Sequence, residues 1–393
     1  MPMPVRISLQ LLVLMLIAPS FAAEPNQTGQ QKSAALQEKV PAGPADSAIQ
    51  QGDTIAHTLL ALELEDTAAP LLWQKLDDLI ARAMSGFAQP PPQELEPAKA
   101  QRFFRAVDEA LIGSGVIFPP KGTVELLRDA LEPRRPTEAE LRPALQEFAN
   151  ARRSQFIQAA RAADDPLYYF DCDLAAMLYV AVAERLKLPV YLVELPGHNF
   201  VRWQSTGVTL NWDPNDGIAK SDQHFAQVAG VTAEDRALLG YLENRTPARI
   251  SSYWLVRRGQ RKASAGKFSA ALLDYRAAVK TSPEDLVAAN ELAWLLATSP
   301  DQTIRDGQEA RAISEKLVAR SRRINWLETL AAAWAETGDF PQAVAVEEEA
   351  RHQAAAWLQS TKRRGSLAGF DACLKAYAQN LSYAAAVKSG LIK

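Results

Sequence analysis

Apolar residues recur at helical spacing from residue 54 onward. The first expected helix starts at Thr54, and its apolar side comprises Ile55, Leu59, Leu60 and Leu62. Further helices are expected over 69–84, 97–113, 122–131 and 137–163. Proline-rich segments separate several of them, because proline cannot continue a helix. The region 51–163 is therefore expected to be mostly helical, and its pattern alone indicates no chemistry.

The pattern changes near residue 164. Asp171 is suited to cap a helix over 172–187, whose apolar stripe predicts burial on one side. Strands are then expected over 190–193, 199–204 and 208–212, where β-branched and aromatic residues dominate. Residues 164–247 are thus expected to form an α+β core, in which a helix precedes a short antiparallel sheet.

An internal repeat marks the C-terminal part of the chain. The pattern Gly-x-Phe-x-x-Ala starts at Gly266 and again at Gly338, 72 residues later (338 − 266). This offset is about twice the 34-residue tetratricopeptide period plus four, and a middle repeat with an insertion at 300–307 fits between the copies. Residues 248–360 are therefore expected to be an all-α tetratricopeptide-repeat domain, followed by a helical tail over 361–393. The stacked repeats are expected to bind a protein or peptide partner in a concave groove.

Composition narrows the function classes. The 393 residues suggest two or three domains, and 48% apolar with 23% charged residues is typical of a soluble globular protein. The chain has 43 basic and 46 acidic residues, so it lacks the excess of positive charge that is typical of nucleic-acid-binding proteins. No nucleic-acid partner is therefore expected. The two cysteines, Cys172 and Cys373, exclude a disulfide-rich scaffold and a four-ligand zinc module. No phosphate-binding glycine loop follows a strand, so no cofactor is expected. His198, Asp213 and His224 have no recognised metal-ligand spacing, so no metal is expected either.

The N-terminus has the pattern of an export signal. A short positive segment precedes the apolar run 7–17, and small residues at Ser20 and Ala22 suit cleavage after Ala22. We expect a signal peptide over 1–22, a disordered linker over 23–50 and an exported protein, such as one of a bacterial periplasm. The alternative is an uncleaved N-terminal anchor. No later apolar run is long enough to span a bilayer, so no stable membrane span is expected after cleavage.

Three residues near the expected sheet could act together. Cys172 lies in the first turn of its helix, where the helix dipole favours a thiolate. His198 opens the second expected strand, and Asp213 ends the third. Such residue types support acyl transfer by a cysteine nucleophile, a histidine base and an orienting carboxylate. The oxyanion would need backbone N–H groups near Cys172, or the hydroxyl of Tyr168 or Tyr169.

The hairpin between the last two strands decides how His198 and Asp213 meet. A turn at Ser205-Thr206 would place them directly opposite each other, with Cβ atoms about 4.5–5.5 Å apart. A turn at Thr206-Gly207 would keep both on one face but offset them by two residues. Either register allows a carboxylate to hold the imidazole.

Simpler interpretations stay open for each residue. Cys172 could be a small buried apolar residue or could pair with Cys373, and the flanking Asp171 and Asp173 would oppose a thiolate. His198 could make only a hydrogen bond at a strand edge, and Asp213 could serve only as a turn former before a proline.

The segment 165–217 resembles a bacterial transglutaminase-like family that carries C-terminal tetratricopeptide repeats. The segments that carry this resemblance are Leu174–Val190, Pro196–His198, Phe200–Arg202 and Asp213–Gly217. The stretch Leu59–Ala83 also resembles the leading helices of that family, so the resemblance covers about residues 50–350. The resemblance implies a small papain/transglutaminase-like core, with Cys172 as nucleophile, His198 as base and Asp213 as orienting acid. It implies a protease, amidase or transamidase. The alternative is a non-catalytic interaction scaffold built from this core and the repeats.

Overall fold

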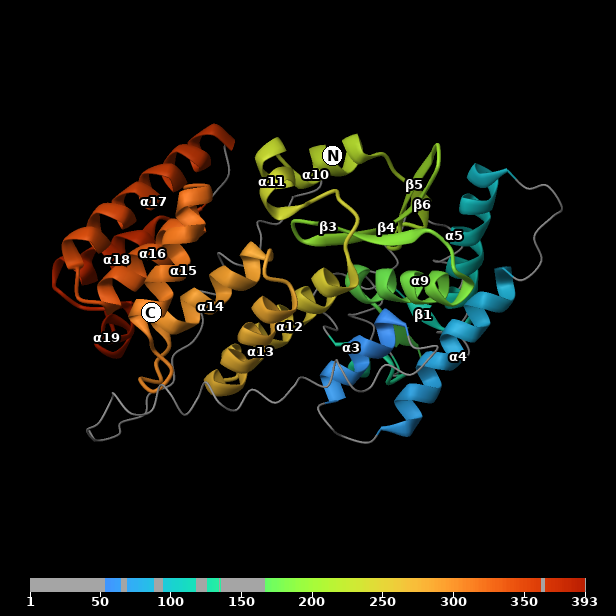
Figure 1. Ribbon diagram of the computed structural model, residues 1–393, viewed down its shortest axis with the longest axis horizontal. Helices are drawn as coiled ribbons and strands as arrows, with labels where there is room; N and C mark the ends of the chain where they lie inside the picture. Colours follow the sequence, from blue (N-terminus) through green and yellow to red (C-terminus); the bar gives the residue numbers. More distant parts are fainter. Residues whose placement is uncertain are drawn as a thin grey trace. The chain divides into compact units, whose positions relative to one another are not determined.

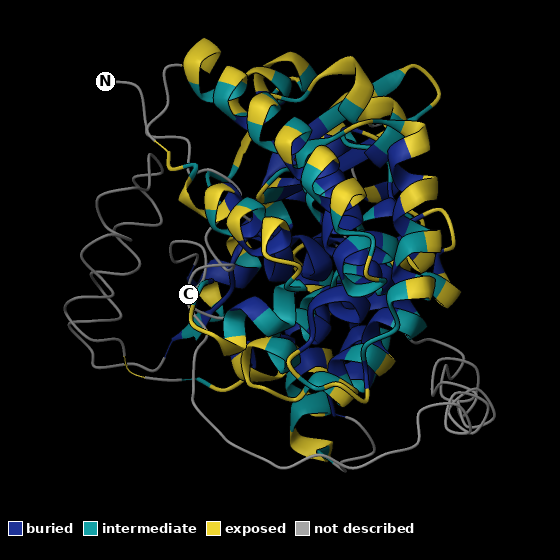
Figure 2. Cartoon of the chain, turned by 90° about the vertical axis from the view of Figure 1, so that its left-hand side faces the viewer, coloured by how far each residue is buried: buried dark blue, intermediate teal, exposed yellow. Residues whose placement is uncertain are grey.

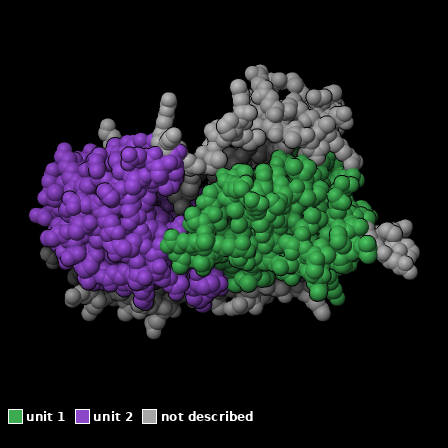
Figure 3. Space-filling model, turned by 90° about the horizontal axis from the view of Figure 1, so that it is seen from above, with its two compact units in different colours: residues 1–8, 42–250 green, residues 9–41, 251–393 purple. Residues whose placement is uncertain are grey.

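The computed structural model describes residues 54–64, 69–87, 95–117, 126–133, 135, 167–361 and 365–392. The expected signal peptide 1–22, the linker 23–50 and the helix over 137–163 lie outside the described residues. Contacts divide the chain into two compact units, and the described part of unit 1 ends at Ile250, while that of unit 2 begins at Ser251 (Figure 3). Each unit is described by itself below.

The first helices of unit 1 follow the apolar pattern. They are α3 (Ile55–Leu64), α4 (Pro70–Phe87), α5 (Glu96–Gly113) and α6 (Leu127–Ala130). The first three confirm the helices expected from Thr54, over 69–84 and over 97–113. The helix expected over 122–131 is described only as the single turn α6, because residues 121–125 lie outside the described residues.

The central helix α9 (Cys172–Leu186) confirms the helix expected over 172–187. Asp171 caps it, since the carboxylate accepts from the N–H groups of Asp173 and Leu174 at 3.0 Å each. Every residue from 172 to 183 is buried, so α9 is covered on all sides. A fully covered helix fixes its N-terminal residues firmly relative to the sheet.

The sheet has the order β3-β4-β5-β6 and is antiparallel throughout. Its strands are β3 (Val190–Leu195), β4 (His198–Ser205), β5 (Val208–Asp213) and β6 (Ile218–Ala219). The first three confirm the expected strands, whereas β6 was not expected. A separate parallel pair, β1 (Val116–Ile117) with β2 (Tyr168–Tyr169), was also not expected.

The two faces of the sheet are covered by different helices. On one face α9 contacts β3 and β4, and the rings of Trp203 and Trp212 pack on Phe103 and Phe104 of α5. On the other face Phe200 stacks on Phe225 of α10 (Asp222–Ala229), at 4.0 Å between ring centroids. Figure 1 shows α9 on one side of the strands, with α10 and α11 (Ala233–Leu239) on the other. Neither α10 nor α11 was expected from the apolar pattern.

The β4–β5 hairpin has the second of the two registers considered above. Val201 lies opposite Trp212 and Ser205 opposite Val208, so the turn is Thr206-Gly207. The direct opposition of His198 and Asp213 is therefore wrong, and the two-residue offset holds. The reason is local: Gly207 has φ +78°, a conformation that residues with a β-carbon disfavour.

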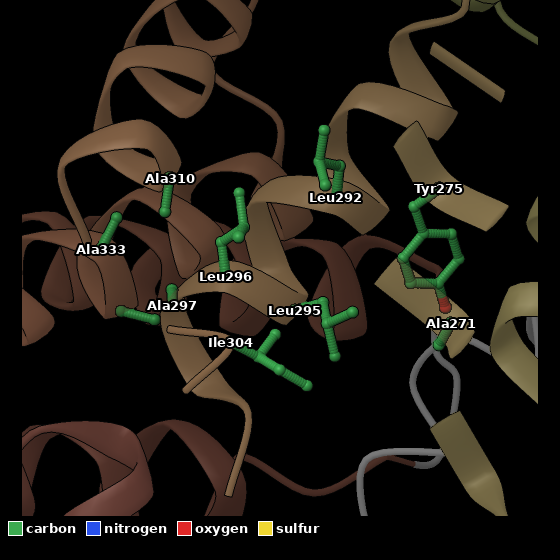
Figure 4. Packing of buried hydrophobic residues seen from close by; sticks show 10 residues of the cluster. Ala271, Tyr275, Leu292, Leu295, Leu296, Ala297, Ile304, Ala310 and Ala333 are labelled. Carbon is green, nitrogen blue, oxygen red and sulfur yellow. The ribbon is translucent and has the colours of Figure 1, made fainter. Parts of the chain in front are cut away.

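Unit 2 is entirely helical over its described residues. Its helices are α12 (Pro247–Ser264, whose first turn precedes the boundary), α13 (Phe268–Thr281), α14 (Leu286–Thr298), α15 (Gly307–Arg320), α16 (Ile324–Glu336), α17 (Phe340–Thr361), α18 (Ala368–Ala378) and α19 (Tyr383–Lys388). From α13 to α19 each helix packs against the next one along the chain. The core between α13, α14, α15 and α16 is formed by alanine, leucine and isoleucine side chains together with Tyr275 (Figure 4). Figure 2 shows how the buried sides of the helices face inward.

Both copies of the Gly-x-Phe-x-x-Ala pattern have the same local structure. Gly266 and Gly338 have φ values of +73° and +84°, and each stands just before a helix that begins at the phenylalanine of the pattern. Ala271 and Ala343 are fully buried. The repeated sequence is thus a repeated helix–turn–helix joint, and its assignment to tetratricopeptide repeats stays a prediction. Within the described residues, every helix is too short or too polar to cross a bilayer.

Candidate functional site

Cys172 is the first residue of α9, as expected, and the residue is only 3% exposed. The first-turn N–H groups of Asp173 and Leu174 are already used by the Asp171 cap. A backbone oxyanion site at this helix would therefore have to use the N–H of Cys172 itself.

The thiol of Cys172 donates to a buried carboxylate. Its Sγ lies 3.4 Å from Oδ1 of Asp173, a residue with no exposed surface. The same oxygen accepts from Nδ2 of Asn199 at 2.9 Å. A negative charge beside the sulfur favours the neutral thiol, as the flanking aspartates suggested from the sequence. Asn199 was not singled out from the sequence, although it directly follows His198.

His198 is the first residue of β4 and follows a tight turn after β3. Its Nε2 lies 3.2 Å from Oδ2 of Asp213, and the two side chains are 23% and 5% exposed. Nε2 is enclosed by protein, and its approach to Asp213 lacks the alignment of a hydrogen bond. Since Nε2 faces Asp213, Nδ1 is the ring nitrogen that could serve a nucleophile.

Asp213 is held on both of its carboxylate oxygens. Oδ1 accepts from the backbone N–H of Asn215 at 3.0 Å, and Oδ2 accepts from Nζ of Lys220 at 2.7 Å. Burial alone would raise the pKa of the Asp213 carboxyl, but His198 and Lys220 outweigh it and hold this pKa well below its usual value. Asp213 is therefore an anion at any pH near neutrality, which an orienting carboxylate requires.

Lys220 is a member of this site that the sequence analysis missed. Burial opposes its charge, but Asp213 and Asp216 more than compensate and raise the pKa of its ammonium group. The signal in the sequence was the Asp-Pro-x-x-Gly turn at 213–217, which allows the chain to return along β5. The two-residue strand β6 that follows is too short to show a pattern.

The structure places the three expected site residues in two neighbouring contacts. His198 and Asp213 approach each other across β4 and β5, on the face that carries Phe225. The thiol of Cys172 contacts Asp173, which in turn is bound by Asn199, the residue next to His198. Neighbouring residues of a strand point to opposite faces, so the first residues of β4 connect the two contacts. The catalytic roles of Cys172, His198 and Asp213 stay predictions.

The alternative of a disulfide is excluded by the structure. Neither Cys172 nor Cys373 forms a disulfide, and both are buried. Among the described residues, no group of three or more histidine, cysteine, aspartate or glutamate side chains is arranged to hold a metal ion.

Comparison with known proteins bears on the same part of the chain. A family model described as the transglutaminase-like superfamily matches residues 174–244. The match includes His198 and Asp213 and begins two residues after Cys172. The curated proteins gave no match, and neither did the solved structures. Residues 174–244, which begin within α9 and end beyond α11, therefore match a transglutaminase-like domain, set within a helix-rich chain.

Proposed function

We propose that this protein is an exported transglutaminase-like cysteine acyl-transfer enzyme, acting on a peptide-like amide. The observation that carries the proposal is the contact of His198 with Asp213, 3.2 Å apart, whose pKa is held well below its usual value. A carboxylate held this close to an imidazole can orient the ring, which is the part that Asp213 has in the proposal. A carboxylate serving only as a turn former would have no need of a histidine ring beside it.

In the proposed reaction the Cys172 thiol gives its proton to Nδ1 of His198 and attacks the carbonyl carbon of the amide. The tetrahedral oxyanion collapses to a thioester as the C–N bond breaks, and the imidazolium returns the proton to the leaving amine. Water or a second amine then attacks the thioester, which separates hydrolysis from transamidation. Asp213 orients the ring throughout and is not protonated.

One specific observation favours the alternative of a non-catalytic scaffold. The thiol is almost fully buried, and it donates to the carboxylate of Asp173. For catalysis this contact must open, so that the sulfur turns from Asp173 toward the ring of His198. In the scaffold, the contact would be permanent and would simply anchor α9 to β4 through Asn199.

Acylation of the full chain distinguishes the two functions. We expect p-nitrophenyl acetate to leave an acetyl group on Cys172, detected by intact mass and removed by hydroxylamine. The Cys172→Ser variant should lack this adduct, and the Cys373→Ala variant should keep it. The His198→Ala variant should acylate at least about 100-fold more slowly, the usual contribution of a general base. Equal rates with and without His198 would support the scaffold instead.

Export and partner binding belong to the proposal as well. The residues 1–22 have the composition of a signal peptide, and the repeated helical joints of unit 2 would offer a surface for a protein or peptide. The mass of the mature N-terminus in the exported fraction tests the first point. Capture of partners by the full chain, compared with the Cys172→Ala variant, tests the second and separates substrates from stable partners.

A further inference from the structure

Lys220 reaches the candidate site because β6 returns along β5. Ile218 lies opposite Asp213 and Ala219 opposite Trp212, so Lys220 follows directly after the last paired residue. Side chains two residues apart on a strand share a face, and Lys220 thus emerges on the face of Asp213. Its backbone N–H donates to Asn211, which continues the pairing by one residue.

The ammonium group of Lys220 is deeply placed for a lysine. Its side chain is 16% exposed, it donates to Oδ2 of Asp213 at 2.7 Å, and it also binds the carboxylate of Asp216. The ring of Phe225 lies 5.9 Å from Nζ, within the range of a cation–π contact. Burial of a lysine is unfavourable unless its charge is paired, and here two carboxylates pair it.

Lys220 and His198 meet at the same atom. Both approach Oδ2 of Asp213, one at 2.7 Å and the other at 3.2 Å, so their nitrogens are no more than about 6 Å apart. Two cations this close repel each other, and Lys220 therefore opposes a proton on His198. At the same time it keeps Asp213 ionised and aimed at the ring.

Other charged or titratable groups on neighbouring elements include Arg202, Asp222, His224 and, from α9, Asp173. The carboxylate of Asp222 accepts from Nη2 of Arg202 at 2.5 Å and from Nδ2 of Asn211 at 2.7 Å. Lys220 with its two carboxylates carries one net negative charge, and a proton on His198 would neutralise it.

We propose that Lys220 is a positioning residue that regulates the candidate site, because it fixes the Asp213 carboxylate toward His198 and limits how readily that histidine takes up a proton. The regulatory role of Lys220 rests on the proposed function, whereas the contact of Lys220 with Asp213 does not. In the proposed function, Lys220 would keep the carboxylate in place while the ring takes up the proton of the nucleophile and returns it to the leaving group.

The test is the titration of His198 in the full chain, followed by NMR of isotope-labelled histidine. The chain has four histidines, and the His198→Gln variant assigns the signal. In the Lys220→Met variant we expect the midpoint of the His198 signal to move to higher pH by about one pH unit. The Lys220→Arg variant should restore the wild-type midpoint, and Lys280→Met, which removes a lysine charge from unit 2, should leave it unchanged.

A second variant covers the case in which Lys220→Met does not fold. Asp216→Asn removes the second carboxylate that pairs with Lys220, so that Asp213 alone offsets the charge of the lysine. The midpoint of the His198 signal should therefore move to lower pH. An unmoved midpoint in Lys220→Met, or in Asp216→Asn if the former is unfolded, overturns the inference. The titration is repeated with Cys172→Ala, which cannot react. If the His198 midpoint shifts but Cys172 is never acylated, the role of Lys220 stands and the proposed enzyme is refuted. If Cys172 is acylated but the His198 midpoint does not shift, only the role of Lys220 is refuted.

Discussion

The contact between Cys172 and Asp173 gives the sharpest test of how the thiol is controlled. The Asp173→Asn variant removes the negative charge but keeps an oxygen that can accept from Asn199, so the bridge between α9 and β4 is retained. The charge lies 3.4 Å from the sulfur. At an effective dielectric constant of about 20, two unit charges at this distance interact by about 5 kcal/mol, an upper limit here because Asn199 shares the charge. Since about 1.4 kcal/mol is a factor of ten, we expect the thiolate to be at least about tenfold more populated at pH 7.

The assay is the rate of carboxymethylation by iodoacetamide, followed by intact mass in a Cys373→Ala background, so that one thiol reacts. Access to the buried sulfur is the same in both proteins, and the ratio of rates therefore reports the thiolate. The Asp371→Asn variant, which removes an exposed charge of unit 2, serves as the matched control and should react like the parent. An unchanged rate in a folded Asp173→Asn protein would refute the view that Asp173 restrains the thiol.

Further predictions concern the stability of unit 2, with a control variant in α5 of unit 1. In Gly259→Ala the new β-carbon would lie 2.5 Å from a tyrosine ring of α13, so we expect a loss of about 1–3 kcal/mol in urea unfolding; Gly113→Ala, which meets nothing within 4 Å, should stay within about 0.5 kcal/mol of the wild type. Burial raises the pKa of Glu328 to about 7, and burial together with Glu328 raises the pKa of Glu347 as well. Both carboxyl pKa values are higher in the folded than in the unfolded chain. The folded state therefore keeps its full free energy of unfolding below about pH 4.5, where these groups are protonated, and loses part of it as the pH rises through about 7. Urea midpoints at pH 5 and pH 8 should therefore differ less in Glu328→Gln than in the wild type, and an equal difference would contradict this assignment.

The sequence predicted the elements of the transglutaminase-like domain that have strong local signals. The helix α9 could be predicted because Asp171 is a good cap and the residues after it are apolar at helical spacing. The strands β3 to β5 could be predicted from their β-branched and aromatic residues. The register could not, because two neighbouring turns were both plausible and only the positive φ of Gly207 decides between them.

Other parts of the site depend on contacts that no local pattern records. The parallel pairing of β1 with β2 joins Val116 to Tyr168, far apart in the chain. Lys220 meets Asp213 only through the two-residue strand β6. The helix α11 did leave a signal, since Thr232 and Asp235 form a capping box, but its apolar stripe is short.

The central claim is that Cys172 and His198 act as one unit, and the pH profile of carboxymethylation tests it most directly. In the Cys373→Ala background, we expect Cys172 to react at pH 6 at least about tenfold faster when His198 is present than in the His198→Ala variant, because an imidazolium beside the sulfur stabilises the thiolate. Superimposable profiles for the two proteins, both rising as for an isolated thiol, would contradict the claim and leave a transglutaminase-like scaffold.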